Sequence, residues 1–151
     1  MEKSMEKAWI LNPPYKEKII REGRCEQEVG LFQTCYPPFT MACLASILKT
    51  KLHVEVLDSV AEEYNEAYLS EKIKKDHPKY VFVNATTPTF NNDIQITKNL
   101  SAISEKTSFF VYGVHASYFH GKINYGKNIL LVKGEPEQKA LELPNKKMDF
   151  E

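Results

Sequence analysis

Three threonines stand together in one short segment, Thr86-Thr87-Pro88-Thr89, between an apolar run and a stretch with helical spacing. Hydroxyl side chains at such a position can accept hydrogen bonds from the free N–H groups of a first helical turn. The same N–H groups can also bind an anion. The segment therefore predicts either a helix cap alone or a cap that also binds a phosphate or carboxylate group.

Glycine and titratable residues follow two later apolar runs. Gly113 precedes Val114 and His115, and we expect this loop to let a flat or bulky ligand approach the backbone while the imidazole forms a hydrogen bond. Gly134-Glu135-Pro136-Glu137 follows the last run, with a proline suited to a first helical turn and an acid near the positive end of the helix dipole. A surface histidine and an ordinary strand-to-helix turn are the simpler alternatives.

Three basic residues lie in the long segment from Pro13 to Pro38, which has no clear periodicity. Long loops without secondary structure are usually functional in compact domains. Lys18, Arg21 and Arg24 could hold a phosphate or a ligand carboxylate there through charge-assisted hydrogen bonds. A solvated charged loop is the alternative.

Known catalytic and metal-binding patterns are missing from the sequence. Cys25, Cys35 and Cys43 are odd in number and widely spaced, so we expect reduced thiols rather than disulfides or a C-x-x-C metal site. The chain has no G-x-G-x-x-G after its first apolar run, no G-x-x-x-x-G-K-[ST], no H-E-x-x-H and no G-x-S-x-G. No self-sufficient catalytic constellation is evident.

The elements that must position these loops begin with five short apolar runs rich in β-branched and aromatic residues. Several runs are apolar without alternation, which is typical of strands buried on both faces of a parallel sheet. Segments with helical spacing separate them, as in α/β proteins. The expected strands are Ala8–Asn12, His53–Asp58, Tyr80–Ala85, Ser108–Gly113 and Ile129–Val132.

Four helices are expected between and after these strands, over Phe39–Lys49, Asn65–Asp76, Asn91–Glu105 and Gln138–Leu143. Five strands favour the flavodoxin-like order over the longer dinucleotide-binding order. The predicted fold class is therefore α/β, a Rossmann-like (flavodoxin-like) doubly wound sheet of about five parallel strands in a three-layer α/β/α arrangement. In such a fold the loops that follow the strands meet at one edge of the sheet.

The chain has 151 residues with 20 basic and 20 acidic side chains, which fits one domain with no net field. We expect a domain over residues 1–143 and a polar tail over residues 144–151. Zero net charge gives no reason to expect nucleic acid or an acidic membrane as a partner. The first apolar run is too short for a signal peptide or a membrane span, so we expect a cytoplasmic protein.

The loop segments follow one another in a defined order at successive expected strand ends: Asn12-Pro13-Pro14, Ile20-Arg21-Glu22-Gly23-Arg24-Cys25, Tyr36-Pro37-Pro38, Thr86-Thr87-Pro88-Thr89 with Asp93, Gly113-Val114-His115, and Gly134-Glu135-Pro136-Glu137. In this order they resemble the N-terminal cobalamin-binding domain of cobalamin-dependent radical SAM proteins, a group that includes the anaerobic magnesium-protoporphyrin monomethyl ester cyclase. The resemblance runs from about Trp9 to Leu143.

In that family the domain holds cobalamin across the carboxyl edge of its sheet, with the lower face of the corrin toward the domain and the nucleotide tail between strand ends. The resemblance implies cobalamin as the cofactor, and no catalytic or metal-ligating residue in this chain. The implied cofactor-binding residues are Pro13, Pro14, Tyr15, Thr86, Thr87, Pro88, Thr89, Gly113, His115, Gly134 and Glu135.

Two features depart from related patterns. The loop Asn12-Pro13-Pro14-Tyr15 stands where methionine-synthase-like domains have D-x-H-x-x-G, so it supplies no cobalt-ligating histidine. The C-x-x-x-C-x-x-C motif is missing, so we expect no iron–sulfur cluster in this chain. The resemblance then implies a cobalamin-binding domain or subunit that acts with a radical SAM subunit or domain supplied in trans.

Two other functions remain open. A small flavodoxin-like protein could bind a nucleotide or flavin, with Thr86 to Thr89 as an anion cradle and His115 as acid or base. A partner-docking module that has lost its cofactor could use the segment from Pro13 to Pro38. Asp58 at a strand end invites comparison with response regulators, but the acidic pair expected after the first strand is missing.

Overall fold

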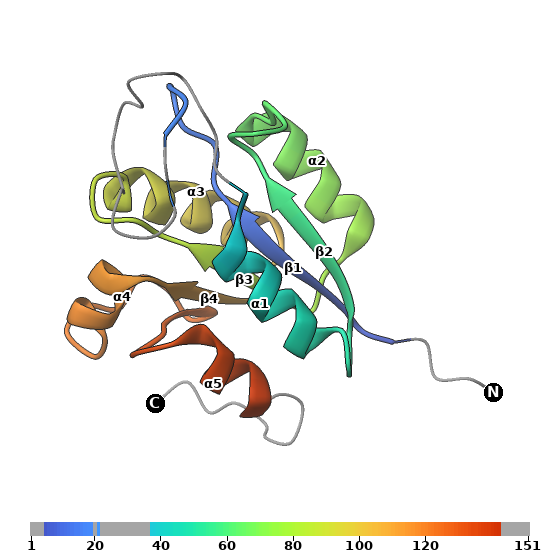
Figure 1. The fold of residues 1–151 in the computed structure, drawn as a ribbon. Helices are drawn as coiled ribbons and strands as arrows, with labels where there is room; N and C mark the ends of the chain where they lie inside the picture. The colour runs from blue at the N-terminus through green and yellow to red at the C-terminus, as the bar shows by residue number, and fades with distance from the viewer. Residues whose placement is uncertain (1–4, 20, 22–36, 143–151) are drawn as a thin grey trace.

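The strands form one parallel sheet in the order β2-β1-β3-β4-β5 in the computed structural model, which describes residues 5–19, 21 and 37–142 (Figure 1). The order is the flavodoxin-like one, so the predicted α/β, Rossmann-like class is confirmed. The strands are β1 (Lys7–Asn12), β2 (His53–Asp58), β3 (Tyr80–Asn84), β4 (Ser108–Tyr112) and β5 (Ile129–Leu131).

The three central strands, β1, β3 and β4, are buried on both faces because helices cover both sides of the sheet. Ile10 pairs with Phe82, which pairs with Phe110, and the two phenyl rings stack with centroids 4.9 Å apart. The neighbouring row, which includes Trp9 and Val81, belongs to the core on the opposite face. Continuous apolar runs in the sequence therefore correspond to strands with two buried faces.

The helices divide between the two faces of the sheet. α1 (Phe39–Leu48) and α5 (Pro136–Glu142) lie on one face and contact each other. α2 (Glu66–Asp76), α3 (Phe90–Ile103) and α4 (Val114–Phe119) contribute to the core on the other face. Figure 1 shows the resulting three layers.

One helix departs from the expectation. His115 was expected in a loop, but it lies in α4, which begins directly after Gly113. This helix has only six residues and buries only Ala116, so its sequence carries no apolar stripe from which it could be predicted. At α5 the expected start at Gln138 is two residues late, because Pro136 already occupies the first helical position.

Some expectations fall outside the described residues, namely those for Arg24, Cys25, Cys35 and the tail over residues 144–151. Cys43 is a free, exposed thiol on α1. In the part of the chain that the structure describes, no helix combines the length and the apolar character that crossing a bilayer requires.

Candidate functional site

The carboxyl ends of all five strands point to one edge of the sheet, because every pairing is parallel. The loops after β3, β4 and β5 at this edge contain most of the predicted cofactor-binding residues. The crevice between β1 and β3 is the topological switch point, since the helices that follow these strands cover opposite faces. Ligands of doubly wound folds bind near such a crevice.

An internal ion pair occupies the α3 side of this crevice. Arg21 Nη1 donates to Asp93 Oδ2 at 2.8 Å and Nη2 donates to Asp93 Oδ1 at 2.9 Å, which is the bidentate geometry of a strong pair. Nη2 also donates to the carbonyl of Pro13 and Nη1 to the carbonyl of Asn84. Nearby, Asn84 Nδ2 donates to Asn12 Oδ1 at 2.9 Å. The ends of β1 and β3 are thus tied together.

This pair corrects both interpretations of Arg21. The side chain is only 2% exposed and its partner is a carboxylate of the same chain, so it is neither a free ligand-binding group nor a solvated one. Lys18 does lie at the surface, where its Nζ is 3.5 Å from Glu63 Oε1. Asp93 had no assigned role, although an acid among the inward-facing positions of α3, beside Phe90 and Ile94, needs a buried cation.

The Thr86 to Thr89 segment divides into inner and outer residues. Thr86 and Thr89 are buried, their hydroxyl oxygens are 2.8 Å apart, and Thr89 Oγ1 donates to Asp93 Oδ2 at 2.6 Å. Thr87 and Pro88 are exposed. Thr89 is the N-cap residue of α3 but makes no side-chain cap, so the expected cap from this hydroxyl is wrong: the Thr89 hydroxyl contacts Thr86 Oγ1 and Asp93 Oδ2 instead.

Gly113 is explained by its own backbone neighbour. Its φ of +124° is a conformation that side chains disfavour, and a Cβ there would lie 2.2 Å from the carbonyl oxygen of Ala85. The glycine therefore allows the β3 and β4 loops to approach each other. His115, half-buried in α4, packs between Phe90 and Phe119 with ring centroids 4.4 and 4.8 Å away.

The loop after β5 presents open backbone. Gly134 has a φ of +77°, nothing within 4 Å of the position of a Cβ, and an N–H that donates to Ser117 Oγ at 2.9 Å. Glu135 is exposed beside it. The hydrogen bond from Gly134 to Ser117 thus joins the loop after β5 to α4, at the end of the sheet opposite β2.

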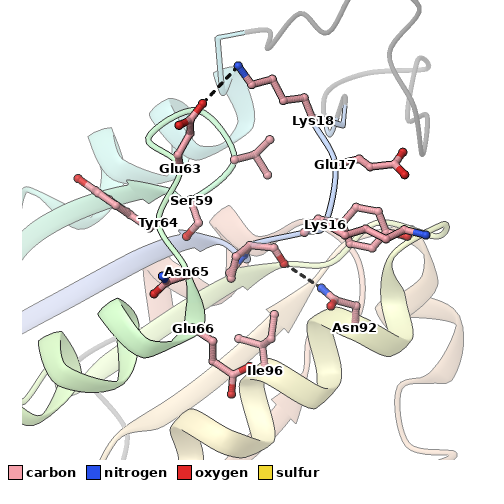
Figure 2. Close-up of a pocket in the computed structure, with 13 residues that line it drawn as sticks. Lys16, Glu17, Lys18, Ser59, Glu63, Tyr64, Asn65, Glu66, Asn92 and Ile96 are labelled. Atoms are coloured by element: carbon pink, nitrogen blue, oxygen red, sulfur yellow. Dashed lines mark hydrogen bonds and ion pairs between the residues drawn. The ribbon is translucent and has the colours of Figure 1, made fainter.

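The remaining predicted residues, Pro13, Pro14 and Tyr15, follow β1. Pro13 is buried, and the carbonyl of Pro14 accepts a hydrogen bond from Asn92 Nδ2 at 3.0 Å. Pro14 and Tyr15 line a cavity of about 480 Å³, which Figure 2 shows between the segment from Tyr15 to Lys18 and the loop after β2.

The cavity after β1 is polar. It is lined by the charged residues Lys16, Glu17, Lys18, Glu63 and Glu66 together with Ser59, Tyr64 and Asn92. Charged side chains of both signs therefore surround this part of the edge. Burial raises the pKa of the Tyr64 phenol, and Tyr68 and Glu62 raise it further, against a smaller lowering by Lys72.

Among the residues that the structure describes, no group of three histidine, cysteine or acidic side chains could hold a metal ion.

Comparisons with known proteins give one informative similarity. A protein of Pyrococcus horikoshii described as an uncharacterized methyltransferase is 28% identical over 97 residues, which are 64% of this chain. The chain spans about a fifth of the length of that protein, since the matched part is 20% of it. No protein-family model matches the chain, and no solved structure matches it.

Proposed function

We propose that this chain is a cobalamin-binding domain or subunit that presents its cofactor to a separate radical SAM subunit or domain. The proposal rests on the resemblance of the loop segments and on the parallel sheet whose carboxyl edge brings those segments together. Similarity to a protein described as a methyltransferase supports it, because cobalamin is a carrier of methyl groups. Under this proposal the radical SAM subunit or domain would supply the radical chemistry.

The observation that carries the proposal is the character of the edge away from the ion pair. Val114 and Tyr118, which lie four residues apart and therefore on one side of α4, are 76% and 65% exposed. Large apolar side chains with so little cover at the ligand-binding edge of a fold mark an interaction site. A broad macrocycle with apolar faces and an amide rim fits such a surface better than a small anion does.

Residues of the loops after β3 and β5 would hold the cofactor. Thr87 and Pro88 are the exposed tip of the β3 loop, and Gly134 leaves its backbone open to a bulky group. Arg21 fills the α3 side of the crevice between β1 and β3, so the cofactor would lie toward β4 and β5. When bound, cobalamin would supply a cobalt-carried methyl group.

The chain's own part is binding and orientation. The pair of Arg21 and Asp93 fixes the β3 loop, and the contact of Gly113 with Ala85 fixes the β4 loop against it. The loop Asn12-Pro13-Pro14-Tyr15 after β1 contains no histidine, so it would supply no lower ligand to the cobalt.

Binding is tested by adding hydroxocobalamin to the purified protein, removing free ligand and recording the visible spectrum, with titration calorimetry for the affinity. We expect a coloured protein and a saturable heat. Val114→Glu should weaken binding about tenfold or more, because the charge would lose water against the corrin.

Leu141→Glu is the matched control. Leu141 is also exposed, at 59%, but it lies near the end of α5, where its carbonyl contacts Lys51 at the opposite edge of the sheet. The affinity of this variant should equal that of the unaltered protein. A colourless protein that gives no heat would rule the proposal out.

A second candidate function, binding of a nucleotide or flavin, is favoured by the polar cavity of about 480 Å³ beside β1. Ser59 lines this cavity, and its buried hydroxyl has no hydrogen-bond partner among the described residues. Denaturing the purified protein and analysing the released material by chromatography tests this candidate. A released flavin or nucleotide in stoichiometric amount would favour it over cobalamin.

A further inference from the structure

Arg21 and Asp93 bring together two parts of the chain that are far apart in the sequence, the segment after β1 and the segment from the end of β3 into α3. Arg21 donates five hydrogen bonds, to the carbonyls of Pro13 and Asn84, to Thr89 Oγ1 and to both oxygens of Asp93. The side chains of the pair are 2% and 0% exposed. Water therefore cannot replace either partner as a hydrogen-bonding group for the Arg21 guanidinium or the Asp93 carboxylate.

The carboxylate of Asp93 holds both ends of the β3 loop. Thr86 donates its backbone N–H to Asp93 Oδ2 at 3.4 Å, and Thr89 donates its hydroxyl to the same oxygen at 2.6 Å. The two residues between these points, Thr87 and Pro88, are the exposed ones. The loop is thus anchored at its two ends, with its middle directed outward.

We propose that Arg21 is a positioning residue for the cofactor-binding edge: it orients Asp93, which holds the Thr86 to Thr89 loop with Thr87 and Pro88 turned toward the ligand. This inference rests on the proposed function for the identity of the ligand. Its first part, control of the loop, does not depend on any ligand.

The geometry explains why an arginine is required. A guanidinium is a planar fork that can bind both oxygens of a carboxylate and still donate to two carbonyls, whereas an ammonium group is a point charge without this fixed arrangement. Both oxygens of Asp93 face the fork at 2.8 and 2.9 Å. A bidentate contact fixes the rotation of the carboxylate, and the carboxylate then fixes the loop.

A purely stabilising role makes a different prediction for the double variant. Arg21→Gln or Asp93→Asn alone leaves an unpaired buried charge, so both single variants should unfold at lower temperature than the unaltered protein. The double variant R21Q/D93N leaves no unpaired buried charge, so its melting temperature should lie above those of both single variants. If Arg21 only stabilised the fold, the loop and ligand affinity would recover together with the melting temperature.

The experiment compares R21Q/D93N with the unaltered protein and with Ile73→Val, which perturbs a buried residue of α2 outside the hydrogen bonds of Arg21 and Asp93. Hydrogen exchange is followed by mass spectrometry in the peptide over residues 84–90, and hydroxocobalamin affinity is measured by titration. We expect faster exchange of this peptide in R21Q/D93N, and an affinity loss of about tenfold, the usual effect of removing a supporting partner at a metal cofactor. Ile73→Val should change neither.

Unchanged exchange over residues 84–90 in the double variant would overturn the inference, as would an affinity equal to that of the unaltered protein. Should the unaltered protein bind no hydroxocobalamin, the proposed function is wrong, and the exchange measurement alone then decides whether Arg21 positions the loop.

Discussion

Two residues set the geometry of the carboxyl edge, Gly113 because it has no side chain and Arg21 because of the contacts that its side chain makes. Gly113 lies where β4 ends and α4 begins, and the carbonyl of Ala85 occupies the space of its missing side chain. Arg21 fills the neighbouring crevice with a fixed fork. Gly113 permits the loops after β3 and β4 to touch, and Arg21 holds the β3 loop in place through Asp93.

Gly113→Ala should destabilise the fold by at least about 2 kcal/mol, because the new Cβ would clash with the carbonyl oxygen of Ala85 and the alanine would have to adopt a strained φ. Gly121→Ala is the control, since Gly121 also has a positive φ, of +70°, but nothing lies near its Cβ position. It should cost only about 1 kcal/mol. Urea unfolding of both variants measures the difference, and equal losses would contradict the role assigned to Ala85.

Residue types at the edge were predictable from the sequence, but their partners were not. A sequence shows that Arg21 is a cation in a long loop, whereas its partner Asp93 lies 72 positions away and becomes a neighbour only when β1 and β3 pair. The close approach of Ala85 to Gly113 likewise depends on the register of β3 and β4. The sequence therefore suggested ligand contacts for two residues whose observed contacts are internal.

The elements themselves were easier to predict than their contacts. Each strand was placed within one residue of its observed ends, because short β-branched and aromatic runs separated by helical spacing have few other interpretations. The helix predicted over Phe39–Lys49 is α1, whose buried residues are Met41, Leu44, Ala45 and Leu48. α4 was not predicted because a helix of six residues completes fewer than two turns, too few to show helical periodicity in the sequence.

The end of α2 offers a prediction at this scale. His77 follows the helix in the left-handed conformation, with a φ of +47°, and its N–H donates to the carbonyl of Ile73. Glycine is favoured at this position, so His77→Gly should stabilise the fold by about 1 kcal/mol. His120→Gly is the matched control because His120 has an ordinary φ of −52°, and it should stabilise nothing. Thermal melts of both variants test this; a lower melting temperature for His77→Gly would contradict it.

Over the whole molecule, a group of charges holds α2 to the outer half of the sheet. Asp76 on α2 accepts Lys7 of β1 at 3.2 Å and Lys72 at 2.9 Å, and Lys72 also contacts Glu55 of β2 at 2.8 Å. Burial alone would raise the pKa of Asp76, but the hydrogen bonds from Lys72 and Lys7 outweigh it and lower the pKa below its usual 3.8. Folding therefore favours the ionised carboxylate.

Stability should consequently depend on acid in a defined way. A lowered folded pKa means that the contribution of Asp76 is complete above the unfolded pKa, near 4, and is lost as the pH falls through the lower folded value. Asp76→Asn should cost about 2 kcal/mol at pH 7 and flatten this part of the acid dependence. Urea unfolding from neutral to acidic pH measures both effects.

Glu71→Gln provides the control for Asp76→Asn. Glu71 pairs with Lys74 on the same helix, but its side chain is 76% exposed, so the change should stay within about 0.5 kcal/mol and leave the acid dependence intact. An acid dependence of Asp76→Asn equal to that of the unaltered protein would show that Asp76 does not couple the helix to the sheet.

The separation of Arg21 and Asp93 along the chain also matters during biosynthesis. Asp93 is translated 72 residues after Arg21, which at about 5 to 20 residues per second is a delay of roughly 4 to 15 s. During that interval the Asp93 carboxylate is not available to the Arg21 guanidinium, and the contacts that fix the end of β1 cannot be completed. A nascent chain arrested before Asp93 would therefore lack the carboxylate that anchors the Thr86 to Thr89 loop in the complete protein.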